Sequence, residues 1–125
     1  MITEQEVKAI DSVTAKCFQA SLKAGWHADI KTGNLIDRNK AEMICLMHSE
    51  LSEVMEGERK DLMDDKLPYR KMAEVELADT VIRIFDYCGR WGYDIAGAIK
   101  EKIEFNANRA DHKIENRLKE NGKKF

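Results

Sequence analysis

The sequence predicts an all-α protein, an antiparallel four-helix bundle, on three observations. One proline and seven glycines in 125 residues leave little of the punctuation that an all-β fold needs. Long stretches repeat their apolar residues with the period of an amphipathic helix. Capping residues followed three positions later by glutamate mark two helix starts. The length suits one domain, residues 1–125, with a single modest core.

The first two helices follow from their caps and apolar stripes. Thr3 and Glu6 form a capping box ahead of a helix expected over about residues 4–23. A loop of about fourteen residues follows, which is long for a compact helical domain. Asn39 can cap the second helix, which is expected to run to about residue 60.

The last two helices are predicted from composition and from glycine breaks. The third is expected over about residues 68–90, with Pro68 as an early helical position. It is apolar over more than half of its circumference, which favours burial at the centre or at a subunit interface. The fourth is expected over about residues 94–119, ending before Gly122.

Four acidic residues form two pairs, and each pair has i,i+3 spacing on a predicted helix. They are Glu50 with Glu53 and Glu76 with Asp79. Such spacing places both carboxylates of a pair on one helix face. The 22 residues between the pairs allow an antiparallel return, so that all four acids can converge. Glu50 also interrupts an apolar arc, where a carboxylate is costly unless it is paired or bound to a metal.

Two interpretations of these acids are open. They can be ordinary surface acids, with Asp79 paired to Arg83 at i+4. Alternatively, they bind a divalent cation through oxygen ligands. A ferritin-like di-iron site needs Glu-x-x-His pairs, and the chain has none. The metal interpretation therefore favours Mg²⁺, with Mn²⁺ as a substitute.

At this point the motifs resemble those of a known family. The two acidic pairs resemble the ExxE…ExxD signature of the MazG-like superfamily of all-alpha nucleoside triphosphate pyrophosphatases. The contexts IxLxHSELSEVMEG and ELADTVIRIFD, then K-x-x-x-N at residues 102–106 with Arg109, resemble successive motifs in order. The resemblance covers roughly residues 25–112 and is closest to short, stand-alone members, some of them phage-encoded.

The resemblance implies a four-helix fold that works as a homodimer or homotetramer. It also implies Mg²⁺-dependent hydrolysis of a nucleoside triphosphate to the monophosphate and pyrophosphate, in a housecleaning role for the nucleotide pool. The four acids would hold the metal, and Glu50 or Glu53 would orient or deprotonate the attacking water.

Candidates for substrate binding lie outside the acidic pairs. Lys102, Asn106 and Arg109 fall within about 60° of one another on the expected fourth helix and could hold a phosphate chain. Alternatively, the two cations lie along the core edge and pair with neighbouring acids. Trp26, on the long loop, could stack on a nucleobase or plug the end of the bundle.

Two further functions are kept open: a pyrimidine-specific dUTP or dCTP pyrophosphatase, and a non-catalytic helical interaction protein. No nucleic-acid partner is expected, because net charge is −2 and the basic residues form no strong stripe. No membrane association is expected either, since no apolar run approaches spanning length. Three widely spaced cysteines without a C-x-x-C motif favour reduced thiols in a cytoplasmic protein.

Overall fold

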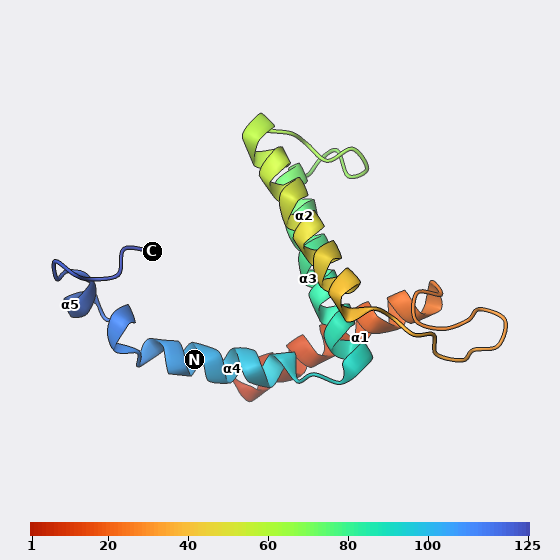
Figure 1. Cartoon of the computed structure of the whole chain (residues 1–125), viewed down its shortest axis with the longest axis horizontal. Helices are drawn as coiled ribbons and strands as arrows, with labels where there is room; N and C mark the ends of the chain where they lie inside the picture. Colours follow the sequence, from red (N-terminus) through yellow and green to blue (C-terminus); the bar gives the residue numbers. More distant parts are fainter. The chain divides into compact units, whose positions relative to one another are not determined.

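The protein is all-helical, which confirms the all-α part of the fold prediction; the four-helix bundle stays a prediction. The computed structural model describes all 125 residues. In chain order the elements are α1 (Glu4–Lys23), α2 (Lys40–Lys60), α3 (Met72–Trp91), α4 (Ile95–Ala107), the 3₁₀ turn η1 (Ala110–His112) and α5 (Ile114–Arg117) (Figure 1). The chain divides into two compact units, Met1–Ser12 with Asp94–Phe125 and Val13–Tyr93. None of the helices has the length and apolar character needed to cross a membrane.

Both predicted helix starts are confirmed by the hydrogen bonds of their caps. The Glu6 amide donates to Thr3 Oγ1 at 3.1 Å, and the Thr3 amide donates to Glu6 Oε1 at 3.1 Å. At the start of α2, Asn39 Oδ1 accepts a hydrogen bond from the Glu42 amide at 3.0 Å. These bonds satisfy amide donors that would otherwise lack a partner at a helix N-terminus.

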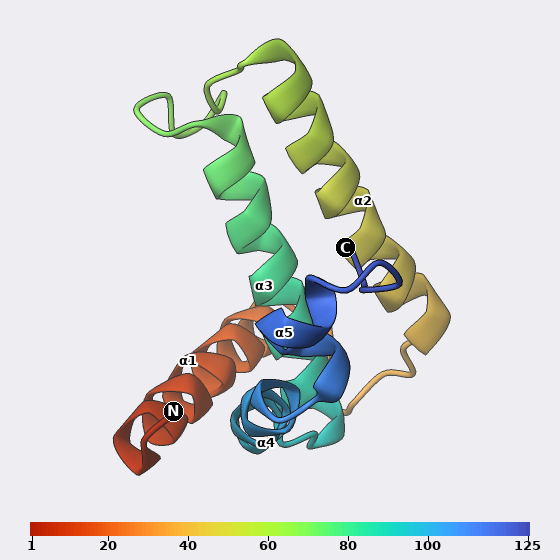
Figure 2. The same cartoon turned by 90° about the vertical axis from the view of Figure 1, so that its left-hand side faces the viewer.

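The α2–α3 hairpin is the main packing feature of residues 13–93. The two helices run side by side and antiparallel, joined at one end by residues 61–71 (Figures 1 and 2). A Cβ placed on Gly57 would lie 3.0 Å from Met72 Cβ, so glycine permits the close approach near the loop. This antiparallel return brings the two acidic pairs of the sequence to the same region.

The third helix begins later than the sequence predicted. Pro68 lies in the loop instead of the first helical turn, and α3 starts at Met72. The reason is the buried Asp64, whose Oδ2 accepts hydrogen bonds from the amides of Lys66 and Leu67. An aspartate that bonds amides two and three residues ahead stabilises a turn in competition with a helix.

The fourth helix is shorter than predicted. Instead of reaching about residue 119, α4 ends at Ala107, and η1 and α5 follow as separate short turns. Asn108 Nδ2 donates to the Glu104 carbonyl, and Arg109 adopts an extended backbone with ψ 132°. Both Arg109 Nε and Nη2 then bond the carboxylate of Asp111, which stabilises the break.

Few apolar side chains of α2 and α3 are fully buried within the chain. Met43, Ala73 and Cys88 are buried, and all three cysteines are free. Several large apolar side chains on the two helices are exposed, namely Ile44, Leu51, Met55, Leu77, Val81 and Ile82. The expected burial of α3 is therefore incomplete in a single chain, where Leu77 is 47% exposed.

Candidate metal centre and adjoining pocket

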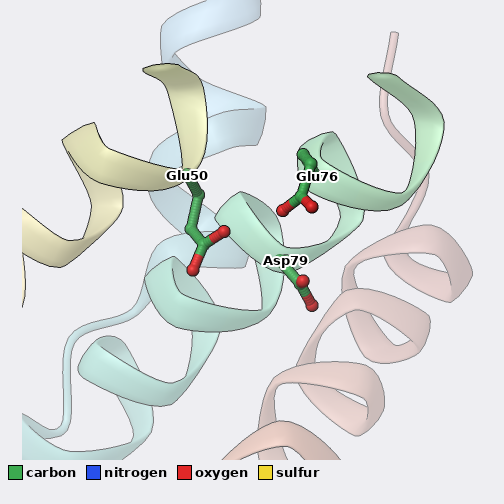
Figure 3. Close-up of side chains that lie close together, drawn as sticks. All are labelled: Glu50, Glu76 and Asp79. Carbon is green, nitrogen blue, oxygen red and sulfur yellow. The ribbon is translucent and has the colours of Figure 1, made fainter. Parts of the chain in front are cut away.

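Three of the four predicted acids converge between α2 and α3. Glu50 extends from α2, whereas Glu76 and Asp79 extend from adjacent turns of α3 (Figure 3). One carboxylate oxygen from each lies within 4.8 Å of the other two. The antiparallel pairing and the i,i+3 spacing on α3 together produce this arrangement. The cluster offers oxygen donors alone, which fits Mg²⁺ or Mn²⁺ better than metals that prefer imidazole or thiolate.

The cluster is electrostatically unfavourable without a cation. Burial, hydrogen bonding with Glu50 and the charges of Asp79 and Glu53 raise the pKa of Glu76 to about 7. Burial and the Glu50 charge also raise the pKa of Asp79, and Arg83 partly offsets this rise. Carboxyl groups whose ionisation is suppressed by one another are expected to favour a divalent cation that neutralises them.

Glu50 has a protein partner that the sequence did not indicate. Arg83 Nε donates to Glu50 Oε1 at 2.9 Å, and only 15% of the Glu50 side chain is exposed. The i+4 alternative paired Arg83 with Asp79, but the ion pair formed is with Glu50, across the two helices. The positive charge of the Arg83 guanidinium explains how the Glu50 carboxylate is accommodated on an apolar helix face. A metal bound by Glu50 would have to compete with Arg83.

Glu53 lies at the margin of the cluster. It is exposed and is not among the three residues whose oxygens lie within 4.8 Å of one another. It is close enough for its charge to contribute to the raised pKa of Glu76. Its predicted role as a metal ligand stays a prediction.

Two pockets in the unit of residues 13–93 adjoin the acids. The first has a volume of about 350 Å³ and is lined by Ser21, Trp26, Arg38, Glu42, Met43, Leu46, Arg83 and Asp86. The second, of about 290 Å³, includes Glu50 and Asp79 in its lining and shares Ser21, Trp26, Arg83 and Asp86 with the first. Trp26, predicted to bind substrate, therefore lies beside the acidic cluster, with 63% of its surface exposed.

Sequence reasoning missed a partly buried polar network at the wall of these pockets. His27 is fully buried, and its Nε2 lies 2.8 Å from Asp86 Oδ1. Ser21 Oγ donates to Asp86 Oδ2 at 3.1 Å. The signal available was the position of Asp86, seven residues after Asp79 and thus on the same face of α3.

The predicted phosphate-binding residues belong to the other compact unit. Lys102 is exposed, with Nζ 4.7 Å from the centroid of the Phe105 ring. Asn106 is partly buried, and its Oδ1 is buried without a hydrogen-bond partner. Arg109 lies beyond the end of α4 and is bonded to Asp111, so the three residues do not share one helix as predicted. Phosphate binding by these residues stays a prediction.

Comparison of the chain with protein-family models, with curated proteins and with solved structures found no match. The resemblance to the MazG-like superfamily therefore rests on the sequence motifs, and the geometry of the acids is the independent observation beside it.

Proposed function

We propose that this chain is a Mg²⁺-dependent nucleoside triphosphate pyrophosphohydrolase that releases pyrophosphate and a nucleoside monophosphate. The observation that carries the proposal is the convergence of Glu50, Glu76 and Asp79, with oxygens within 4.8 Å of one another. The adjoining pocket of about 350 Å³ is of the size that encloses small ligands, and it contains an exposed tryptophan. The motif order in the sequence supports the same reaction.

Each residue of the site has a proposed role. Glu50, Glu76 and Asp79 hold the cation, which when bound supplies Lewis acidity that polarises a phosphoryl oxygen and activates water. Glu53 is exposed at the margin, so its carboxylate is available to orient or deprotonate the attacking water. Trp26 stacks on the nucleobase.

Binding of the phosphate chain is assigned, on the sequence motif alone, to residues of the K-x-x-x-N segment. Lys102 and Asn106 offset its charge in this proposal, as the spacing of the K-x-x-x-N motif implies. Arg109 is the weaker candidate, because its guanidinium is already bonded to Asp111 through two nitrogens.

The test is pyrophosphate release from a panel of ribo- and deoxyribonucleoside triphosphates, with Mg²⁺ and with excess chelator. We expect release that requires Mg²⁺ and leaves the monophosphate as the other product. Turnover confined to dUTP and dCTP would identify the narrower pyrimidine enzyme. Release of inorganic phosphate in place of pyrophosphate would contradict the proposed bond cleavage.

A non-catalytic helical interaction protein is the alternative from a different class. The exposed apolar side chains of α2 and α3 favour it, because such a surface suits a protein partner. Calorimetry with Mg²⁺ and a non-hydrolysable triphosphate separates the two functions. An interaction protein should bind neither ligand, whereas the enzyme should bind the triphosphate more tightly when Mg²⁺ is present.

We propose further that the chain completes a four-helix bundle and assembles as a homodimer or homotetramer. Leu51, Met55 and Leu77 are 46%, 62% and 47% exposed, so a second copy could bury apolar surface that one chain leaves in water. Size-exclusion chromatography with light scattering is expected to give a mass of two or four chains. Replacing Leu51 and Leu77 by glutamate should shift the mass to that of one chain. A wild-type protein that stays monomeric at high concentration would contradict this assembly.

A further inference from the structure

Asp86 lies in a position from which it can contact a bound ligand directly. It lines both pockets beside the acidic cluster, and 14% of its side chain is exposed. It lies on α3, seven residues beyond Asp79, so it shares the pocket face of the helix without joining the three-acid cluster. None of the roles proposed for the pyrophosphohydrolase uses this carboxylate.

Two partners, the buried His27 and the half-buried Ser21, hold Asp86 in a fixed orientation. His27 Nε2 lies 2.8 Å from Asp86 Oδ1, and Ser21 Oγ donates to Asp86 Oδ2 at 3.1 Å. His27 is itself immobilised: it is fully buried, and the centroid of its ring lies 5.3 Å from that of Phe18. Its carbonyl accepts hydrogen bonds from Arg90 Nη1 and from the Ile36 amide. A carboxylate fixed in this way is preorganised, which lowers the entropic cost of binding a ligand.

A carboxylate is an acceptor only, so Asp86 selects for hydrogen-bond donors on the ligand. Each of its oxygens has one partner within the protein and keeps further acceptor capacity toward the pocket. The histidine donates through Nε2 in this arrangement, because the carboxylate cannot donate. Ser21, which also lines both pockets, and His27 each occupy one acceptor site of Asp86, so the remaining lone pairs are available to a ligand.

The other walls of the first pocket favour a flat ring carrying both donors and acceptors. Trp26 presents an exposed aromatic surface, and its carbonyl accepts from Arg38 Nη1 at 2.6 Å. Met43 and Leu46 supply apolar contacts. Arg38 and Arg83 supply donors, which suit the carbonyl and ring-nitrogen acceptors of a nucleobase.

We infer that Asp86 is the specificity-determining acceptor of the site, and that it selects nucleobases carrying an exocyclic amino group over their oxo or unsubstituted counterparts. The inference rests on the proposed function, since it takes the pocket as the place of the nucleobase. An amino group of the base donates a hydrogen bond to Asp86. A carbonyl oxygen at the same position would instead face the carboxylate oxygen, and two acceptors cannot form a hydrogen bond. An analogue without the group leaves Asp86 without its ligand partner. The expected discrimination is about 10- to 100-fold in kcat/KM.

The experiment compares matched nucleotide pairs in the wild-type protein and in Asp86→Asn. The pairs are dCTP against dUTP, which exchange the 4-amino group for an oxo group and the N3 acceptor for an N–H donor, and dGTP against dITP, which differ by one amino group alone. The wild-type protein is expected to prefer the amino-bearing member of the better-used pair about 10- to 100-fold. Asp86→Asn should lower kcat/KM for that member and bring the two values to within about threefold, because the asparagine amide can also donate to a carbonyl oxygen of the base. Asp11→Asn, at an exposed position of α1, makes the same change of charge and should leave the preference unchanged.

Binding provides a readout that does not depend on turnover. Non-hydrolysable analogues of dCTP and dUTP should differ in Kd by a similar factor for the wild-type protein and not for Asp86→Asn. Equal use of both members by the wild-type protein, or a uniform slowing of all nucleotides by Asp86→Asn, would overturn the inference while pyrophosphate release still supported the proposed function. Absence of release from every nucleotide would overturn both. The wild-type comparison needs no variant, so the inference is tested even if Asp86→Asn folds poorly.

Discussion

Glu50→Gln is expected to abolish pyrophosphate release, lowering kcat/KM by at least about 100-fold while helix content is unchanged. Glutamine keeps the shape and one carbonyl acceptor for Arg83, but it removes the charge that the proposed cation requires. Asp79→Asn should have a similar effect, although Asp79 forms no ion pair with Arg83. Rates with Mg²⁺ measure the loss of turnover, circular dichroism measures the unchanged helix content, and calorimetry measures the expected loss of Mg²⁺ binding.

Two controls separate metal binding from the ion pair. Glu58→Gln makes the same chemical change at an exposed position of α2 and should keep full activity. Arg83→Gln breaks the pair while leaving the acids intact, so Mg²⁺ should bind at least as tightly as in the wild-type protein. If Arg83→Gln instead lost Mg²⁺ binding, or if Glu50→Gln kept its activity, Glu50 would be a partner of Arg83 and not a metal ligand.

Local signals predicted the parts of the fold that depend on nearby residues. The caps at Thr3 and Asn39 were found because the groups that form them lie three positions apart. The ends of helices were harder, since the loop around Asp64 and the break near Arg109 depend on side-chain hydrogen bonds that compete with helical ones. Helix propensity does not show whether the side-chain or the helical hydrogen bonds will form at these positions.

The candidate site was predicted only in part, because some of its contacts follow from local spacing and others depend on residues far apart in the sequence. Pair spacing and antiparallel return placed Glu50, Glu76 and Asp79 together. Arg83 was on the correct helix, but its choice of Glu50 over Asp79 depends on the distance between α2 and α3, which no sequence pattern encodes. His27 and Asp86 are 59 positions apart in the sequence, so their pairing is recognised only in the folded structure.

Glu76 is expected to make the fold less stable as the pH rises from about 4.5 to about 7. Its pKa is about 7 in the folded protein against an ordinary value of 4.5, so between these values the folded state binds more protons than the unfolded state. The free energy of unfolding must therefore fall as pH rises through this window. We expect a loss of about 1–2 kcal/mol, less than the full shift would give, because Glu76 is partly exposed and interacts with Glu50.

Urea unfolding followed by circular dichroism between pH 5 and pH 8 measures this loss. Glu76→Gln cannot ionise, so its stability should depend less on pH than that of the wild-type protein, and the two curves should converge at low pH. Glu58→Gln should keep the wild-type slope. Saturating Mg²⁺ should restore more stability at pH 8 than at pH 5.5, because the cation must displace the proton of Glu76 at the lower pH. A wild-type slope retained in Glu76→Gln would show that other groups govern the pH dependence, and equal stabilisation by Mg²⁺ at both pH values would place its binding site away from Glu76.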